Sequence, residues 1–548
     1  MRSKINFGTG GAARSTRSHR IPHSGSARSS EFHSAHFPAE PVSQGNVLRN
    51  LNKPLRILKF GGTSVADAAC ITKVAEIIRA AAAESDIVVV VSAMSGVTNK
   101  LIEAAVQSEA GNCEAVETIF AQLRQRHDVA VDALIHSDAE RIRIRESMRK
   151  LFEEGERWCQ GTMLLRELTP RTRDSISSLG ERLSAPLVAA VLAENGVPSA
   201  CIEATELVVT DSYHGGAEPR MDLTRIACEA RLHPLLQQGI VPVVTGFIGA
   251  NEEGVLTTLG RGGSDYSATI LGAALAADEV IIWTDVDGLL TADPRLVPGA
   301  RTISEISYHE AAELAYFGAK VLHPKTLRPV MQQGIPLRIR NTFEPENPGT
   351  KITSAGPANV AGITAITAIS EAALITLGGP GLSGVQDVLG RTFATAAAVR
   401  ADVLLISQSS AQNDICLVVA SSMSKRTVEA LRHEFAHDLA HEKAEHIALD
   451  STVAIVTVVG QKVRMSGIVG RTFGALGRQN VNIVASAHGA SECNISFVVA
   501  KKDMQAALVA THHEFQLGQL NPTTLPIASP DDPATWYCEA ERAAAEAD

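Results

Sequence analysis

The residues best suited to chemistry lie in short segments rich in glycine and hydroxyl side chains. The first, residues 59–64 (KFGGTS), directly follows an apolar run. Paired glycines let backbone N–H groups approach an anion closely, and a helix beginning behind them adds the positive end of its dipole. Lys59 could then reach phosphate oxygens as a point charge. The glycine pair alone could also be an ordinary strand-to-helix turn. The segment is not a P-loop, because it does not end in Gly-Lys-Ser/Thr.

Two further segments have the same character. Residues 92–99 (SAMSGVTN) and 245–249 (TGFIG) each follow an apolar run as well. In open α/β sheets, ligands bind beyond the carboxyl ends of the strands. We therefore expect all three loops to gather at one edge of a sheet.

Charged residues occur in the glycine-rich segments that follow residue 257. In residues 258–267 (TLGRGGSDYS), Arg261 could present its fork bidentately to a carboxylate. Asp265 could complement an ammonium group, or could simply cap a helix. Segments 283–288 (WTDVDG), 293–295 (DPR) and 316–324 (YFGAKVLHP) follow, and the last brings a second lysine, Lys320. We expect His323, which precedes a proline, to be structural.

The elements that must position these residues alternate along the chain. Apolar strand candidates occupy residues 55–60, 87–92, 240–245 and 279–284. Helical stretches separate them, including a long charged one at about 113–167. Short buried strands that alternate with helices predict an α/β fold, with a mostly parallel sheet covered on both faces.

A Pro-, Gly- and Asn-rich run at 341–357 predicts a domain boundary. After it the sequence repeats itself: the segments that begin with GRTF at Gly390 and Gly470 align without a gap at an offset of 80 residues. Each copy reads as helix, strand, turn and strand, preceded by a strand (373–377 or 453–459). The repeat therefore predicts two small α+β units.

Together these motifs resemble one family. KFGGTSV, SAMSGVTN, SLGERLSA, TLGRGGSDYSA, WTDVDG, DPR and YFGAKVLHP are similar to those of the aspartate kinases, in the family's order over about residues 55–520. The kinase half, with GGPGLSG and SQSS of the tail, most resembles the kinase moiety of bifunctional aspartokinase–homoserine dehydrogenases. The resemblance implies an amino-acid kinase fold (an αβα sandwich) and two βαββαβ ACT domains. The expected organisation is a disordered extension at 1–52, a catalytic domain at 53–345, a linker at 346–360, an ACT pair at 361–525 and an acidic tail at 526–548.

The resemblance also implies site residues. Catalytic roles fall to Lys59 and Lys320. The expected ATP contacts are Lys59, Phe60, Gly61, Gly62, Thr284, Asp285, Leu290, Arg295, Lys320 and Val321. The expected aspartate contacts are Ser92, Thr98, Glu181, Arg261, Ser264 and Asp265. No metal-ligand set is expected in the protein, because the acidic residues are too few to enclose Mg²⁺, which would be carried by the ATP phosphates.

The implied reaction transfers the γ-phosphoryl group of ATP to the β-carboxylate of L-aspartate, giving 4-phospho-L-aspartate, the first step towards lysine, threonine and methionine. Arg261 could hold the α-carboxylate, and either Glu181 or Asp265 the α-ammonium group. An ionised carboxylate is already a nucleophile, so catalysis would rest on in-line positioning and charge neutralisation. The alternatives are a related kinase acting on glutamate or a nucleotide, and an inactive amino-acid sensor; both lysines, Arg261 and Glu181 count against the sensor.

The tail contains a misleading motif. Residues 379–384 (GPGLSG) match a dinucleotide-binding fingerprint, but the unit is too small and the second repeat lacks the glycines. We expect instead that the ACT pair binds a feedback amino acid, with Gln408 and His488 as effector contacts. Gln408 in SQSS favours threonine, and lysine is the alternative. Because little chain follows Leu520, we expect no homoserine dehydrogenase domain.

Composition limits the classes of binding partner and the cellular compartment that we expect. The net charge of −10 and a pI near 6.0 argue against nucleic acid or an anionic membrane as a partner. Eight scattered cysteines indicate a reducing compartment. Residues 1–50 are rich in Ser and Arg and hold two acidic residues, which fits an upstream start on a cytoplasmic enzyme, our preference, or an organelle transit peptide. A homo-oligomer, dimer or tetramer, is expected.

Overall fold

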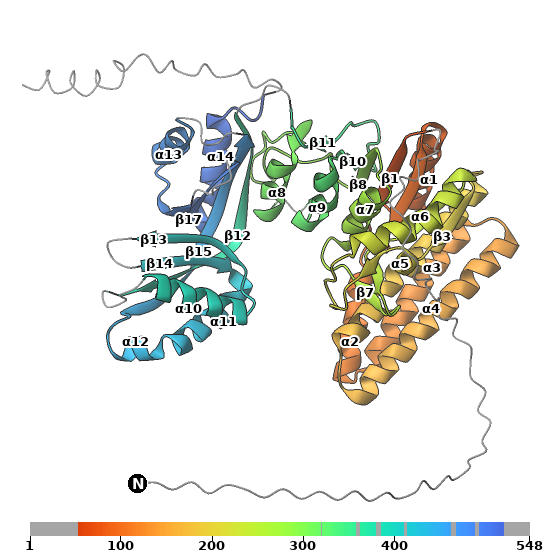
Figure 1. The fold of residues 1–548 in the computed structure, drawn as a ribbon, viewed down its shortest axis with the longest axis horizontal. Coiled ribbons are helices and arrows are strands. Elements are labelled where there is room, and N and C mark those ends of the chain that lie inside the picture. The colour runs from red at the N-terminus through yellow and green to blue at the C-terminus, as the bar shows by residue number, and fades with distance from the viewer. Residues whose placement is uncertain are drawn as a thin grey trace, which may run out of the picture. The chain divides into compact units, whose positions relative to one another are not determined.

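The computed structural model describes residues 53–318, 321–357, 362–379, 385–409, 414–461, 467–487 and 493–519. The expected N-terminal extension and acidic tail lie outside these ranges, as do Lys320, His488 and most of the GPGLSG motif. Figure 1 shows the ribbon with its helices and strands labelled.

The catalytic region is built on an eight-stranded sheet of order β3-β5-β2-β1-β8-β10-β11-β9. Neighbouring strands from β3 to β10 are parallel, and only the β10–β11 pair is antiparallel. The strands are β1 (Leu55–Phe60), β2 (Asp86–Val91), β3 (Ser199–Ile202), β5 (Val241–Thr245), β8 (Glu279–Thr284), β9 (Glu305–Ser307), β10 (Leu337–Asn341) and β11 (Thr350–Thr353). This confirms the predicted α/β fold with a mostly parallel sheet.

Helices cover both faces of this sheet. Successive side chains of a strand point to opposite faces, and in these strands the side chains on both faces are apolar. Leu58 and Phe60 of β1 pack into one core, and Leu55 and Ile57 pack into the other. The first core contains α1 (Ala68–Glu84), α2 (Val97–Ala110), α3 (Cys113–Leu134), α4 (Asp138–Leu165) and α5 (Pro170–Glu194). The second contains α6 (Met221–Gln237), α7 (Gly263–Ala274), α8 (Tyr308–Tyr316) and α9 (Pro324–Gln333).

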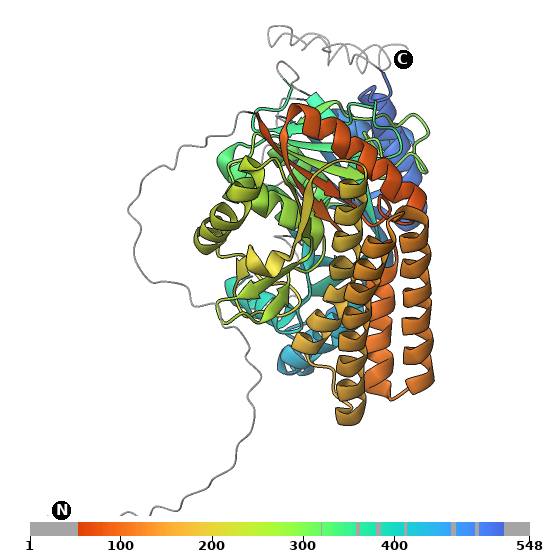
Figure 2. The ribbon, with the colours of Figure 1, turned by 90° about the vertical axis from the view of Figure 1, so that its right-hand side faces the viewer.

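The four predicted strands of this region agree with β1, β2, β5 and β8 to within one residue. The long charged helix expected at about 113–167 is wrong as a single element, since the chain breaks between α3 and α4. Ser137 caps the second helix, and the backbone N–H groups of His136 and Ser137 donate to Glu194, 2.9 Å away in each case. These bonds replace helical ones at the break. Figure 2 shows the long helices of residues 97–194 side by side, in orange to gold.

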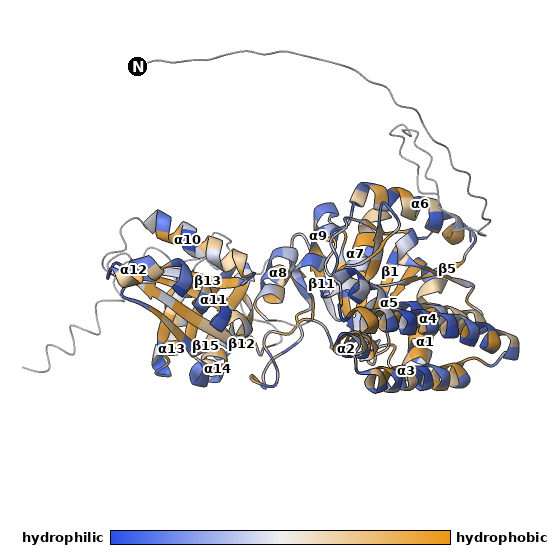
Figure 3. Cartoon of the chain, turned by 90° about the horizontal axis from the view of Figure 1, so that it is seen from below, coloured by the Kyte–Doolittle hydropathy of each residue, from blue (hydrophilic) through white to orange (hydrophobic). Residues whose placement is uncertain are grey.

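Helix α5 is long and apolar enough to span a membrane by length and composition, but 83% of its most apolar window is buried inside the domain. It packs against α2, α4 and β5, as a core helix does. In Figure 3 the central strands are largely hydrophobic, whereas α3 and α4 present hydrophilic residues on their outer sides.

A second, three-stranded sheet lies in the same region. It has the order β4-β6-β7 and consists of β4 (Val209–Thr210), β6 (Ile248–Asn251) and β7 (Leu256–Thr258), with a 3-10 turn at Ala204–Glu206 before it. Strand β7 ends at Thr258, the first residue of the TLGRGGSD motif. This small sheet therefore carries the loop that contains Arg261.

The regulatory region has one six-stranded sheet of order β13-β14-β12-β15-β17-β16. Two long strands, β12 (Gly362–Gly378) and β15 (His446–Gln461), run antiparallel through its centre, and each gives one half to each repeat. The first repeat adds α10 (Val385–Ala398), β13 (Val403–Ser409), β14 (Asp414–Ala420), α11 (Ser421–Glu434) and α12 (Ala436–Ala440). The second adds α13 (Ile468–Arg478), β16 (Ile483–Ala487), β17 (Asn494–Ala500), a 3-10 turn at Lys501–Asp503 and α14 (Met504–Glu514). The two predicted α+β units are confirmed.

The catalytic sheet reaches further along the chain than the expected boundary at residue 345. Strand β11 lies within the predicted linker (346–360), yet it pairs with β10 and β9. A Pro/Gly-rich turn and a domain linker have the same composition, so the sequence could not separate them.

Candidate active site

Strand β1 places Lys59 at the carboxyl edge of the sheet. Lys59 is 7% exposed, and Phe60 beside it stacks on Trp283 of β8, with ring centroids 6.0 Å apart. The backbone N–H of Gly61 donates to the Trp283 carbonyl at 3.1 Å. These contacts fix the first glycine loop between the two central strands, as expected for a ligand loop at this edge.

Lys59 makes an ion pair with Asp265, with Nζ 2.5 Å from Oδ1. Asp265 lies in the first turn of α7, whose N-cap is Gly262, so the capping alternative for Asp265 is not what the structure shows. The pair joins the end of β1 to the start of α7. The negative charge of Asp265 is therefore balanced by Lys59.

Glu181 lies in the middle of α5 and is 3% exposed. Helix α5 comes close to the 92–99 loop because residue 180 is glycine: a Cβ there would lie 2.6 Å from the Cβ of Ala93. The Ser184 hydroxyl also donates to the Ser92 carbonyl at 2.7 Å. Glu181 Oε2 has no hydrogen-bond partner among the described residues. Burial raises the pKa of this carboxyl to about 8, although backbone hydrogen bonds and Lys59 oppose the rise.

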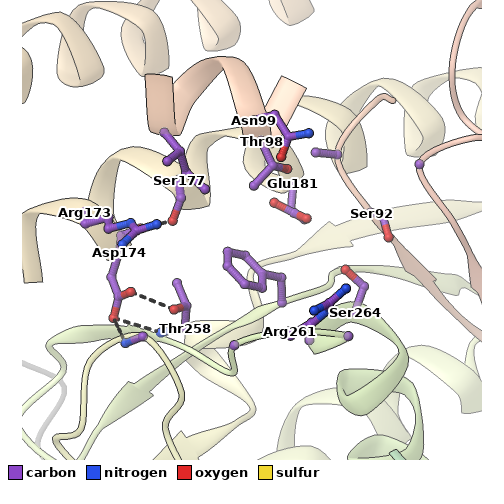
Figure 4. Close-up of a pocket in the computed structure, with 18 of the residues that line it drawn as sticks. Ser92, Thr98, Asn99, Arg173, Asp174, Ser177, Glu181, Thr258, Arg261 and Ser264 are labelled. Atoms are coloured by element: carbon purple, nitrogen blue, oxygen red, sulfur yellow. Dashed lines mark hydrogen bonds between the residues drawn. The ribbon is translucent and has the colours of Figure 1, made fainter. Parts of the chain in front are cut away.

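These groups line one cavity of about 1480 Å³. In Figure 4, Thr98, Asn99 and Glu181 lie on one side of it, and Arg261 and Ser264 lie on the other. The cavity brings together eleven of the expected site residues: Lys59, Gly61, Gly62, Ser92, Thr98, Glu181, Arg261, Ser264, Asp265, Thr284 and Val321. Segments as far apart in sequence as those of Lys59 and Val321 thus meet at one edge of the sheet.

Four expected ATP contacts do not line this cavity. Phe60 is buried under Trp283, so only its backbone could reach a ligand. Asp285 and Leu290 lie outside the lining, and the Arg295 side chain is 81% exposed and paired with Asp293. Lys320 lies outside the described residues. Their roles remain predictions.

Two further expectations concern residues outside the catalytic groups. His323 caps α9, and its Nδ1 accepts from the backbone N–H of Lys325 at 3.3 Å, which confirms a structural role. Burial, together with the nearby charges of Lys325 and Arg261, lowers its pKa. Gln408 lies exposed on β13, opposite Ile415 of β14.

Sequence reasoning missed part of the cavity wall. Asp174 and Ser177 precede Glu181 on the same helix and line the cavity, as do Arg173 and His214. Ser177 follows Asp174 by three residues, and Glu181 follows Ser177 by four. This spacing could have revealed one polar face of a helix. His214 carried no such signal, because only the fold brings its loop to α5.

Mg²⁺ could be held here only with help from a ligand. No group of three or more His, Cys, Asp or Glu side chains suited to a metal occurs in the described parts of the chain. Asp265 is already paired with Lys59. This donor set fits a cation that arrives on nucleotide phosphates and not one enclosed by protein carboxylates.

Comparison with known proteins agrees with this geometry. Residues 54–341 match the amino acid kinase family, and residues 375–435 and 456–515 match an ACT domain. Aspartokinase 1 of Arabidopsis thaliana is 33% identical over 469 residues, which cover 84% of this chain and 80% of that protein. The bifunctional aspartokinase/homoserine dehydrogenase of Haemophilus influenzae is 33% identical over 84% of this chain, but the match covers 56% of that protein. The chain thus spans about half the length of such bifunctional relatives.

Solved structures give the same result. Escherichia coli aspartokinase III in complex with aspartate and ADP superposes with a TM-score of 0.72 at 30% identity, over 84% of this chain and all of that one. The same enzyme in complex with lysine and aspartate gives a TM-score of 0.69 at 31% identity, over 84% of this chain and 99% of that one. The chain belongs to the amino acid kinase family, among its aspartokinases.

Proposed function

We propose that the chain is an ATP-dependent aspartate kinase that forms 4-phospho-L-aspartate. The observation that carries this proposal is the buried carboxyl of Glu181, whose Oε2 has no hydrogen-bond partner among the described residues, in the same cavity as Arg261 and the Lys59–Asp265 pair. Such a cavity offers an amino acid one carboxyl that can ionise against its ammonium group and one positive group, next to a lysine and a glycine loop suited to phosphates. The related structure with aspartate and ADP supports the same ligand pair.

The structure favours Glu181 over Asp265 as the partner of the substrate ammonium group. Asp265 Oδ1 forms an ion pair with Lys59 at 2.5 Å, whereas Glu181 Oε2 has neither an ion-pair nor a hydrogen-bond partner among the described residues. Arg261 can take the α-carboxylate in a bidentate contact. With both α substituents of the amino acid held, the β-carboxylate is left to face the phosphate site.

Phosphoryl transfer would then require little beyond positioning and charge. The ionised β-carboxylate attacks the γ-phosphorus in line, and the bond to the ADP oxygen breaks. Lys59 and the backbone N–H groups of Gly61 and Gly62 can neutralise the developing charge. Mg²⁺ bound to the nucleotide would supply further charge neutralisation when present.

The regulatory region supports feedback control by an amino acid. Its match to ACT domains and the lysine-bound relative support this kind of control. We favour threonine over lysine because the SQSS segment around Gln408 resembles the threonine-responsive pattern. The amide of Gln408 could donate and accept hydrogen bonds to a bound amino acid. A homo-oligomer and a cytoplasmic location belong to the same proposal.

Steady-state ADP release with aspartate, glutamate or UMP as acceptor tests the function. Aspartate-dependent turnover that exceeds the other two by orders of magnitude is expected. With the α groups held, the longer side chain of glutamate would place its carboxylate out of line with the γ-phosphorus, and UMP lacks both α groups. Turnover with glutamate or UMP equal to that with aspartate contradicts the proposal.

A further inference from the structure

Helix α5 carries a second buried carboxylate, Asp174, two turns before Glu181. Residues at positions i, i+3 and i+7 of a helix share one face, so Asp174, Ser177 and Glu181 lie along the same side of α5. All three line the cavity (Figure 4). Asp174 is 3% exposed.

Unlike Glu181, Asp174 is fully engaged by the protein. Its Oδ1 accepts from the Thr258 hydroxyl at 2.6 Å. Its Oδ2 accepts from the backbone N–H groups of Gly215 and Thr258 at 3.0 and 3.2 Å, and from His214 Nδ1 at 2.9 Å. Four donors from two distant segments therefore converge on one carboxylate.

These two segments carry the substrate side of the cavity. Thr258 ends β7, three residues before Arg261, and Gly215 lies in the loop that follows β4. The segments also contact one another: Ala217 N–H donates to the Thr258 carbonyl at 2.9 Å. Gly260, with φ of +79°, has so little room that a Cβ would lie 3.0 Å from the Gly215 carbonyl oxygen.

We propose that Asp174 is a positioning residue that sets the separation between Glu181 and Arg261. It connects the helix that bears one charged group to the strand end that bears the other. The inference rests on the proposed function, in which these two groups hold the α-ammonium and the α-carboxylate groups of the acceptor. The nucleotide side, formed by β1 and β8, makes no described hydrogen bond to Asp174.

The charge of Asp174 is needed for this role. A carboxylate only accepts, so it can satisfy N–H and O–H donors at both oxygens. An asparagine would place an NH₂ group against at least one of these donors, and it would lose the charge-assisted strength of the bonds. Asp174→Asn should therefore loosen β7 and the 211–217 loop from α5 without changing side-chain volume.

Steady-state kinetics of Asp174→Asn separates positioning from general stability. We expect the aspartate KM to rise about ten- to a hundredfold, and the ATP KM to stay within about twofold. Glu194→Gln is the matched control: Glu194 also lies on α5 and accepts two backbone N–H bonds, but at the far end from the cavity. It should leave both KM values unchanged.

Thr258→Val provides a second variant should Asp174→Asn fail to fold, because it removes only the 2.6 Å bond. A smaller rise in the aspartate KM, again without a change for ATP, is expected. Equal rises for both substrates, or no rise in a folded variant, overturn the positioning role. Wild-type protein without aspartate-dependent turnover contradicts the proposed function instead, so the two failures are distinguishable.

Discussion

Glu181 offers a quantitative test of the substrate site, because its carboxyl must ionise to bind an ammonium group. Burial raises its pKa from the ordinary 4.5 to about 8. At pH 7 about nine-tenths of the sites then carry a protonated carboxyl before aspartate binds. An ammonium group next to Oε2 favours the charged form and lowers the pKa again.

Aspartate binding at pH 7 should therefore release about 0.9 proton per site. The sign follows from the raised pKa: below about pH 8 the free site holds a proton that the occupied site does not. Aspartate affinity should accordingly rise with pH, by about tenfold per pH unit, and level off above about pH 8. The pKa of Glu181 rises from 4.5 to about 8. At about 1.4 kcal/mol per pKa unit, this rise corresponds to on the order of 5 kcal/mol by which burial disfavours the ionised carboxylate.

Isothermal titration calorimetry in two buffers of different ionisation enthalpy measures this proton release. Glu181→Gln cannot ionise, so its binding should be weaker and should release no proton. Glu194→Gln is the control: backbone N–H bonds already lower the pKa of Glu194, and its removal should leave proton release unchanged. Proton release that is absent in the wild type, or equally large in Glu181→Gln, refutes the assignment of Glu181.

Three further substitutions test the remaining groups. Lys59→Ala should lower kcat by a factor of hundreds, because a lost transition-state charge contact costs about 3–4 kcal/mol, and activity within a few-fold of wild type would remove Lys59 from the phosphate site. Arg261→Lys should mainly raise the aspartate KM, since a fork becomes a point charge; a raised ATP KM alone would place Arg261 on the nucleotide. Inhibition curves with threonine and with lysine, repeated on Gln408→Ala, should show threonine inhibition that the substitution weakens, through a coupling of typically about 1–3 kcal/mol. Lysine inhibition that is indifferent to Gln408, with no threonine effect, would reverse the choice of effector.

Sequence patterns predicted the central strands and the repeat well, because buried parallel strands read as short apolar runs and duplicated segments align directly. They failed where composition is ambiguous. The charged run that forms α3 and α4 has no proline or glycine at its break, and the break depends on Glu194 from a different helix. Strand β11 was likewise missed, because the turn directly before it is rich in Pro, Gly and Asn, as a linker is.

The same limit applies to the residues of the site: those in local motifs could be predicted, and those that depend on the fold could not. Residues inside local motifs, such as Lys59 and Arg261, could be found from the sequence. The choice between Glu181 and Asp265 could not, because it depends on the Lys59–Asp265 pair, which joins residues about 200 positions apart. His214 was missed for the same reason, because its contact with Asp174 exists only after the chain has folded. Asp174 was missed although its spacing to Ser177 and Glu181 marks one polar face of a helix.

Trapping the product with hydroxylamine tests the central claim most directly. An acyl phosphate reacts with hydroxylamine to give a hydroxamate, which can be quantified and identified by mass spectrometry. With ATP, Mg²⁺ and aspartate, the wild-type chain should accumulate the β-hydroxamate of aspartate, and Lys59→Ala should form it hundreds-fold more slowly. Absence of aspartyl hydroxamate from the active wild-type reaction, or a hydroxamate formed equally well from glutamate, would contradict the account.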